Sequence, residues 1–285
     1  MQAEWHAIEA GIVTGPLVQA ERRGAFWFVR LNRADKRNAL SEPMIGELIA
    51  ACDAVEADRE ARAMVLWGAG GSFCAGGDFD RFQELIASPA PAGADPIATH
   101  NRIFGTMLER VATLPVATIG AVRGAAMGGG MGLACALDRV IATDDAVFAL
   151  PEVALGLAPA QIAPFVARRL GAARGAWHML AAARFDASAA QSAGIVDRIV
   201  ATAGLSDAVA GELAQLARVE PAAMRATKRM ARRNESAPLR AALDAAAQDF
   251  AALLRSGRAS AGIDAGRERR PPPWHTEVPP LPEFN

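Results

Sequence analysis

The sequence predicts an α/β fold that ends in a helical subdomain. Short apolar runs, Ala63–Trp67 and Val116–Val122, are typical of buried strands, and each is followed by a glycine-rich turn. Stretches of helical periodicity separate these runs, whereas from Leu205 onward the pattern is helical only. Strands that alternate with helices and then give way to helices alone indicate an α/β protein with a helical C-terminal unit.

Composition limits the classes of function. Of 285 residues, 52% are hydrophobic and 21% charged, enough for one large packed domain. The net charge of −1, with Lys and Arg spread along the chain, argues against a nucleic-acid surface. Three cysteines without CxxC spacing predict neither a disulfide framework nor a metal site. With no signal-peptide pattern and no run long enough to span a bilayer, we expect a cytoplasmic protein without a membrane partner.

The first part of the chain supplies strands, loops and two helices. Residues Leu17–Arg30 predict a hairpin buried on both sides, which turns at Glu21–Gly24. A polar loop follows at 31–40, and Ser41 is expected to cap a helix with Pro43 near its start. After a low-complexity loop at 88–95, a helix is expected over 96–113.

The second part is mainly helical. A helix is expected from Pro159 to Leu170, and a strand over 194–200. Further helices are expected at 172–182, 187–193 with Asp186 as its cap, 205–218, 221–232 and 237–255. Six prolines in 271–285 indicate an extended tail. We therefore expect a core over 1–200, a helical subdomain over 201–270 and a tail over 271–285.

The stretch from Ile119 to Leu157 is where chemistry is expected. A strand runs into Gly128–Gly130 and then into an apolar helix. At a helix start the first N–H groups face outward with the positive end of the dipole, and glycine allows a ligand to approach them closely. Glu152 is an isolated carboxylate in apolar surroundings, which favour a raised pKa. Backbone donors near one carboxylate suggest carbonyl chemistry with proton transfer.

A second glycine-rich loop follows a strand at 68–79. Two such loops can place one backbone N–H each on either side of a single oxygen, which is the requirement of an oxyanion hole. Each loop taken alone is equally typical of an ordinary tight turn. The glycine spacing does not match the dinucleotide or Walker fingerprints.

Four segments together resemble one family. They are Asp35–Leu40, Phe73–Asp78, Gly124–Gly130 and Leu150–Glu152, in this order. The set is similar to the enoyl-CoA hydratase/isomerase (crotonase) superfamily, and the match covers nearly the whole chain. The C-terminal residues Arg269, Arg270, Pro271 and Trp274 also look like the usual ending of that family.

The resemblance implies a crotonase-type spiral of ββα turns with a helical C-terminal region that mediates trimers, often paired into hexamers. It also implies an acyl-CoA thioester substrate and no metal or redox cofactor. The N–H groups of Gly77 and Gly129 would hold the thioester oxygen as an enolate forms, and Glu152 would act as acid and base. Contacts to CoA or the substrate are expected from Lys36, Arg37, Ala39, Ala75, Gly76, Asp78, Phe79, Gly128 and Pro151.

One departure from the family pattern leaves three functions open. Gly132 stands where two-glutamate hydratases have their first glutamate. The chain resembles, in Leu155–Phe165, single-glutamate hydratases of branched glutaconyl-type esters such as 3-methylglutaconyl-CoA and isohexenylglutaconyl-CoA. The alternatives are a Δ3,Δ2-enoyl-CoA isomerase that uses Glu152 as its proton shuttle, and a non-catalytic acyl-CoA-binding protein. Glu109 is a candidate second acid, and Arg81 and Arg123 are candidate partners for a distal carboxylate.

Overall fold

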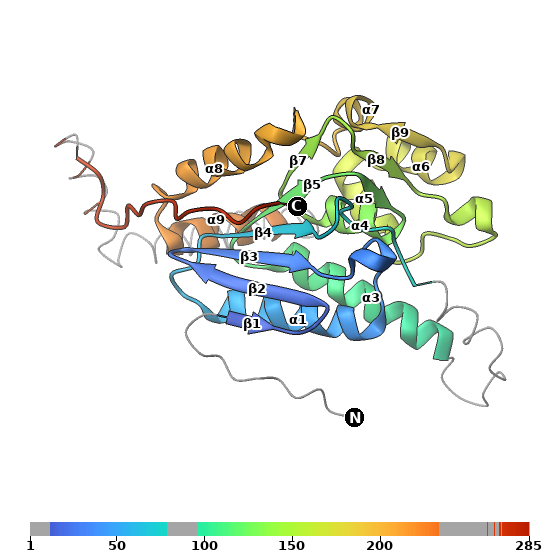
Figure 1. Ribbon diagram of the computed structural model, residues 1–285, viewed down its shortest axis with the longest axis horizontal. Helices are drawn as coiled ribbons and strands as arrows, with labels where there is room; N and C mark the ends of the chain where they lie inside the picture. Colours follow the sequence, from blue (N-terminus) through green and yellow to red (C-terminus); the bar gives the residue numbers. More distant parts are fainter. Residues whose placement is uncertain are drawn as a thin grey trace.

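A seven-stranded sheet lies at the centre of the protein, in a computed structural model that describes residues 12–78, 96–233, 261, 265, 268 and 270–284 (Figure 1). Its strand order is β1-β2-β3-β4-β5-β7-β10. The pairs β1–β2 and β2–β3 are antiparallel, and every later pair is parallel. The strands are β1 (Ile12–Thr14), β2 (Val18–Arg23), β3 (Phe26–Leu31), β4 (Ala63–Gly68), β5 (Ala117–Val122), β7 (Arg139–Thr143) and β10 (Arg198–Val200).

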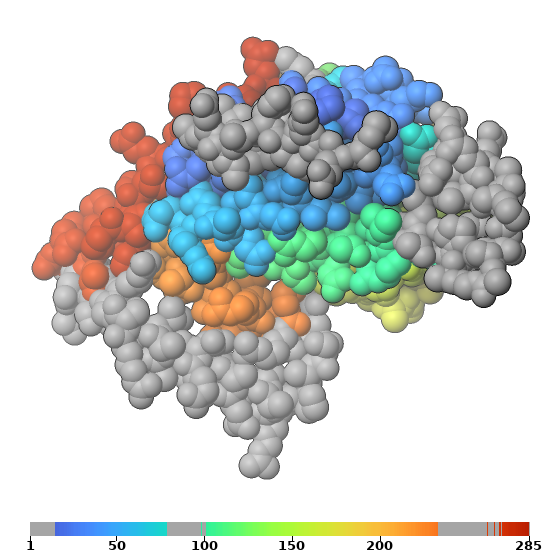
Figure 2. All heavy atoms as spheres, turned by 90° about the horizontal axis from the view of Figure 1, so that it is seen from below, coloured from blue at the N-terminus to red at the C-terminus, as the bar shows by residue number. Residues whose placement is uncertain are grey.

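Both faces of this sheet are buried, which explains why its strands read as continuous apolar runs. On β3, Trp27 and Val29 face one core, whereas Phe26 and Phe28 face another. The first core includes side chains of α1 (Glu42–Ala57) and α3 (Pro96–Thr113). From below, α1 and α3 lie side by side over this face, and α9 (Pro221–Arg233) lies next to them (Figure 2).

The second core is closed by α8 (Leu205–Leu216) and by the C-terminal tail, which runs back across the sheet (Figure 1). Phe284 packs edge-on against Trp67 with ring centroids 5.2 Å apart. The guanidinium of Arg62 donates to the carbonyl oxygens of Ala217 and Trp274. Residues 271–284 form no helix or strand, as predicted. Their contacts also complete a core, which the sequence did not indicate.

A second sheet contains three short strands, β6 (Ala125–Met127), β8 (Val147–Ala149) and β9 (Arg184–Asp186), in the order β6-β8-β9. The chain alternates between the two sheets, because β5 leads to β6 and then to α4 (Gly129–Ala136) before it returns as β7. These strands are three residues long, too short to show a periodicity in the sequence. None of them was predicted.

The remaining elements mostly follow expectation, with differences at their ends. The helix expected from Pro159 begins at Ala163, and the strand expected from Gly194 begins at Arg198. Ser41 precedes α1 but makes no capping hydrogen bond with its side chain, whereas Asp186 caps its helix by accepting from Ala189 N–H at 2.8 Å. These helices are α5 (Ala163–Leu170), α6 (Ala172–Ala181) and α7 (Ala187–Ala193). The short 3-10 turns η1 (Ala34–Lys36), η2 (Glu152–Leu155) and η3 (Thr202–Gly204) were not predicted.

Two predicted segments, the loop at 88–95 and the helix at 237–255, lie outside the described residues. Across the part of the chain that is described, no helix is long and apolar enough to cross a membrane.

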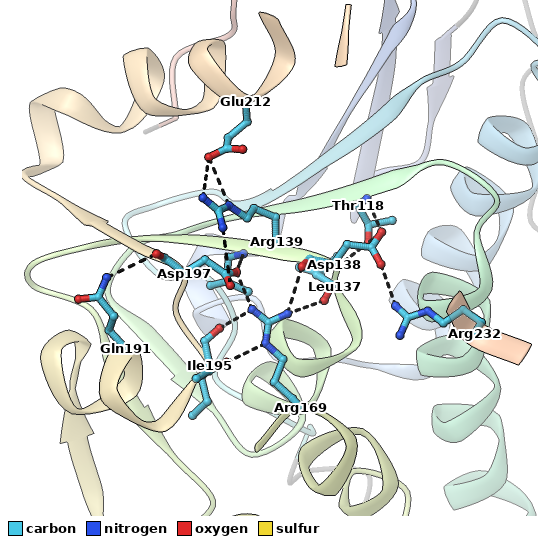
Figure 3. A network of polar contacts seen from close by, with 12 residues as sticks. Thr118, Leu137, Asp138, Arg139, Arg169, Gln191, Ile195, Asp197, Glu212 and Arg232 are labelled. Atoms are coloured by element: carbon cyan, nitrogen blue, oxygen red, sulfur yellow. Dashed lines mark hydrogen bonds and ion pairs between the residues drawn. The ribbon is translucent and has the colours of Figure 1, made fainter. Parts of the chain in front are cut away.

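A network of ion pairs joins α5, α8 and α9 to β7 and to the residues just before β7 and β10 (Figure 3). Arg139 on β7 pairs with Glu212 on α8 at 3.0 Å. Arg169 on α5 donates to the carboxylate of Asp197 at 2.6 Å and to the carbonyl oxygens of Leu137, Asp138, Gly194 and Ile195. Asp138 accepts from Lys228 Nζ at 2.5 Å and from Arg232 Nη2 at 2.7 Å. Burial lowers the pKa of Lys228, and the nearby Asp138 carboxylate opposes this change.

We expect Asp138→Ala to lower the free energy of unfolding by about 3 kcal/mol, because it leaves the Lys228 ammonium without the carboxylate that balances its burial. The measurement is the midpoint of urea unfolding. The dependence of the unfolding free energy on urea concentration should be the same in the variant and the wild type, which shows that both unfold in the same two-state transition. Asp53→Ala is the matched control, since it breaks an ion pair with Arg110 in which Asp53 is 61% exposed. That control should cost less than about 1 kcal/mol; equal losses in both variants would contradict the prediction.

Candidate active site

A buried asparagine joins two loops at the carboxyl ends of β3 and β4. The side chain of Asn38 donates to the carbonyl oxygens of Ala69 at 2.9 Å and Ser72 at 2.7 Å, and accepts from Arg33 N–H at 2.8 Å. Its φ of 57° lies in the left-handed region, which asparagine tolerates better than most residues. Asn38 therefore fixes the loop after β3 onto the glycine-rich loop after β4.

Further backbone contacts extend this junction toward Asp78. Ala75 N–H donates to the Arg37 carbonyl at 2.9 Å, and Leu40 N–H donates to the Gly76 carbonyl at 2.8 Å. The carboxylate of Asp78 pairs with Arg33 at 2.6 Å. Lys36 and Arg37 are exposed on the outer side of the junction, and Ala39 is half-buried beside them.

The segment 74–77 lies directly against the turn that precedes α4. Met127 N–H donates to the Cys74 carbonyl at 3.0 Å, and a β-carbon on Gly130 would lie 2.2 Å from that same oxygen. A β-carbon on Gly76, which has a φ of +104°, would lie 2.9 Å from the Met127 carbonyl oxygen and 3.5 Å from the Gly129 nitrogen. The two backbones approach this closely only because both positions are glycine.

Two backbone N–H groups at this contact are candidate oxyanion donors. The parallel bridge between Leu40 and Gly77 uses the Gly76 carbonyl and the Asp78 N–H, so the Gly77 N–H points to the other side. Gly129 is the first residue of α4, where the N–H has no carbonyl partner within the helix. Among the described residues, neither group donates a hydrogen bond to the protein.

Glu152 begins the 3-10 turn η2 next to these donors. Its Oε1 lies 2.8 Å from the place that a β-carbon on Gly128 would take, and its Oε2 is buried without a hydrogen-bond partner among the described residues. Burial raises the pKa of this carboxyl, and a hydrogen bond from its own backbone N–H partly opposes the change. Pro151 precedes it, and Gly128 N–H is tied to the Ala149 carbonyl at 2.8 Å. A carboxyl with a raised pKa and an oxygen without a partner is a candidate for proton exchange.

Two apolar side chains border the first turn of α4. Phe104 on α3 stands over Gly129, where a β-carbon would lie 2.9 Å from its Cζ. Ile162 lies over Gly132, where a β-carbon would meet its Cγ2 at 2.8 Å. The space where a glutamate at position 132 would begin is therefore filled by Ile162.

The sequence profile of the Enoyl-CoA hydratase/isomerase family matches residues 21–277. The chain belongs to this family.

The resemblance seen in the sequence is thereby confirmed. AtuE of Pseudomonas aeruginosa superposes with a TM-score of 0.87 at 42% identity, over 91% of this chain and 100% of that one. The mevalonyl-coenzyme A hydratase SIDH of Beauveria bassiana is 37% identical over 65% of this chain and 69% of its own. The 2,3-dehydroadipyl-CoA hydratase of Escherichia coli is 30% identical over 85% of this chain and 92% of its own. The protein is accordingly an enzyme of the enoyl-CoA hydratase/isomerase class with a crotonase-type α/β fold.

The structure brings most of the predicted site residues together. Gly76 lies against Gly129, and Gly77 follows it in the chain, whereas Glu152 lies against Gly128. Ala75 and Pro151 adjoin these residues in sequence. Phe79 and Arg81 lie outside the described residues.

Other candidates lie elsewhere or have a different role. Glu109, the candidate second acid, is 57% exposed and pairs with Arg102 at 2.9 Å. Arg123 follows β5, and its carbonyl accepts from Phe73 N–H at 2.8 Å. Burial raises the pKa of Cys74 to about 12, so it stays a thiol near neutral pH and is no nucleophile. No group of three or more His, Cys, Asp or Glu that could hold a metal occurs within the described ranges.

Sequence reasoning gave no individual role to Asn38, Phe104 or Ile162, although Asn38 and Ile162 lie in segments that carry the resemblance, Asp35–Leu40 and Leu155–Phe165. Asn38 carried a usable signal, because asparagine in a polar loop often bonds to backbone groups and adopts left-handed geometry. Phe104 and Ile162 carried none, since each reads as an ordinary apolar residue of its own helix or turn.

We expect Gly128→Ala to lower kcat by at least about 100-fold, because Gly128 has φ 50° and ψ −116° and its new β-carbon would lie 2.8 Å from the Glu152 carboxylate. The measurement is turnover of an enoyl-CoA, with the thermal midpoint recorded in parallel. Gly46→Ala on α1 is the control, since nothing lies within 4 Å of its β-carbon position. Wild-type turnover by folded Gly128→Ala would show that the turn does not position Glu152.

Proposed function

We propose that this enzyme reversibly hydrates an α,β-unsaturated enoyl-CoA of branched or glutaconyl type, with Glu152 as its single acid/base. The observation that carries the proposal is that Glu152 Oε2 is buried and has no hydrogen-bond partner among the described residues. It belongs to a carboxyl that lies next to the turn in which the Gly129 N–H is a candidate donor. A buried carboxylate oxygen without a hydrogen bond costs stability, so its position is best explained by a water or substrate proton that it engages.

In the proposed reaction Glu152 accepts a proton from water as the water oxygen bonds to C3 of the substrate. The double-bond electrons move to the thioester carbonyl, and the resulting enolate oxygen accepts hydrogen bonds from Gly77 and Gly129 N–H. Glu152 then returns its proton to C2, so one water is added across the double bond. One such backbone donor is typically worth about 10²–10³ in rate. The step involves no redox change, and the proposal needs neither a metal nor a redox cofactor.

Binding of the CoA arm is proposed at the junction of the two loops. Lys36 and Arg37 are exposed cations at its outer side, where phosphate groups would meet them, and Ala39 lies beside them. The peptide segment from Ala75 to Phe79, with Asp78 in its ion pair, would border the pantetheine arm, and Gly128 and Pro151 would border the acyl group.

The names of the relatives support the proposed acyl group. One relative is named for mevalonyl-CoA, which carries a branched acid, and another for 2,3-dehydroadipyl-CoA, which carries a second carboxylate. Ile162 over Gly132 leaves an apolar wall where two-glutamate hydratases are expected to carry a carboxylate, which suits contact with an apolar part of the acyl chain.

A Δ3,Δ2-enoyl-CoA isomerase is the second candidate. The same single carboxylate can remove a proton from C2 and return it at C4, so the filled space at Gly132 is compatible with this reaction too. A non-catalytic acyl-CoA-binding protein ranks below both, because binding alone would not require a buried carboxylate oxygen without a partner.

We also propose a homotrimer, or a dimer of trimers. Support comes from large apolar side chains exposed on η2, the segment after it and α6, which a neighbouring copy would cover. These side chains are Val153, Leu155, Leu157, Trp177 and Leu180.

We expect Glu152→Gln to lower turnover by about 10²–10⁴-fold while CoA-ester binding is retained, because the amide cannot exchange the proton. The measurement is product mass on crotonyl-, 3-methylglutaconyl-, isohexenylglutaconyl- and 3-hexenoyl-CoA. A Glu152-dependent gain of one water on the branched esters supports the hydratase. A shift of the double bond without a mass change supports the isomerase, and tight binding without any turnover supports the binding protein.

The raised pKa of Glu152 predicts opposite effects of pH on activity and stability. Hydration needs the ionised base, so kcat/KM should fall as pH is lowered through a pKa above the ordinary value of 4.5. Because the folded state holds this proton more tightly than the unfolded state, the stability contribution is lost as pH rises through the folded pKa. Glu152→Gln should therefore be at least as stable as wild type at pH 7, measured by thermal midpoint. A variant that is less stable at pH 7 would contradict this assignment.

A further inference from the structure

We propose that Arg102 and Gln161 form a receptor for a carboxylate at the far end of the acyl chain, which would make the enzyme selective for dicarboxylic enoyl-CoA esters. The inference rests on the proposed function, because it assumes that an acyl chain occupies the site at Glu152.

A glycine in the middle of α3 brings the two side chains together. The place that a β-carbon on Gly105 would take lies 2.0 Å from Gln161 Oε1 and 3.0 Å from Arg102 Nη1. A glycine inside a helix lowers the stability by about 1 kcal/mol relative to alanine, so the absence of a side chain at Gly105 calls for an explanation. It lets the amide of Gln161, on the segment before α5, lie directly against α3 beside the guanidinium.

Gly105 and Gln161 are the sequence neighbours of the two residues that form the apolar wall of the site. Gly105 follows Phe104, which stands over the oxyanion candidate Gly129, and Gln161 precedes Ile162, which lies over Gly132. Arg102 itself leaves α3 on the solvent side, and its guanidinium folds back toward Gly105. An acyl chain that extends from the thioester along this wall would bring its last atoms toward Arg102.

The chemistry of the pair suits a carboxylate. A guanidinium has five N–H donors, and Arg102 directs Nη1 to Thr106 Oγ1 at 3.3 Å and Nη2 to Glu109 Oε2 at 2.9 Å. Arg102 and Glu109 are 58% and 57% exposed, so their attraction alone contributes little to stability. A substrate carboxylate can take the place of Glu109 on this fork, and the Gln161 amide can add a donor.

The test compares dicarboxylic with monocarboxylic esters. For Arg102→Gln we expect kcat/KM to fall about 10-fold or more on 3-methylglutaconyl-CoA and to change less than 2-fold on crotonyl-CoA, because a hydrogen bond to a charged group is lost on one ester only. Glu109→Gln, which removes the competing carboxylate, should leave or increase activity on the dicarboxylic ester. Arg59→Gln removes the same charge from an exposed turn and is the matched control.

Binding of the saturated esters glutaryl-CoA and butyryl-CoA, measured by calorimetry, separates the two proposals. If the wild type hydrates 3-methylglutaconyl-CoA and crotonyl-CoA, and Arg102→Gln lowers the affinity for glutaryl-CoA and butyryl-CoA equally or not at all, the receptor is excluded and the hydratase stands. If no ester is hydrated, the proposed hydratase is wrong. The receptor is then supported if the wild type binds glutaryl-CoA more tightly than butyryl-CoA and Arg102→Gln removes this difference. It is excluded if the wild type binds both saturated esters equally.

Discussion

The contact between two backbone segments, 74–77 and 127–130, is the constraint on which the candidate active site depends. A carbonyl of one segment accepts from an N–H of the other, and the glycines on both sides leave no room for a β-carbon. Because neither segment is a long helix or strand, each needs outside support. Asn38 supplies it on one side, and the pairing of β6 with β8 supplies it on the other. The donors are therefore held in place before any ligand binds, which is the condition for electrostatic stabilisation of an enolate.

Two half-buried carboxylates differ in their surroundings. Asp138 accepts hydrogen bonds from donors that include Lys228 and Arg232, so its charge is compensated within the protein. Glu152 has one oxygen with no such partner among the described residues. The first arrangement joins helices to the sheet, whereas the second leaves hydrogen-bonding capacity unused next to the turn before α4. An oxygen without a partner therefore distinguishes a candidate reactive carboxylate from a structural one more clearly than burial does.

Sequence patterns predicted the parts of the fold that are long and periodic, and the parts of the site that depend on glycine and an isolated charge. The strands at 63–68 and 117–122, the helix at 96–113, and the glycines around Glu152 were all foreseeable. The three-residue strands of the small sheet were not, because their pairing is decided by partners far along the chain. Phe104 and Ile162 were not foreseeable either, since only packing in three dimensions brings them over the first turn of α4.

The returning tail has a consequence for how the chain folds. Arg23 holds the carbonyl of Pro280, 257 residues later in the sequence, and Phe284 enters a core with Phe26 and Phe28. During synthesis one face of the central sheet thus stays uncovered until α8 and finally the tail have left the ribosome. Contacts of such long sequence separation slow folding and leave apolar strands open to association. Completion of the second core therefore has to wait for α8 and the tail, which follow the strands that they cover by many residues.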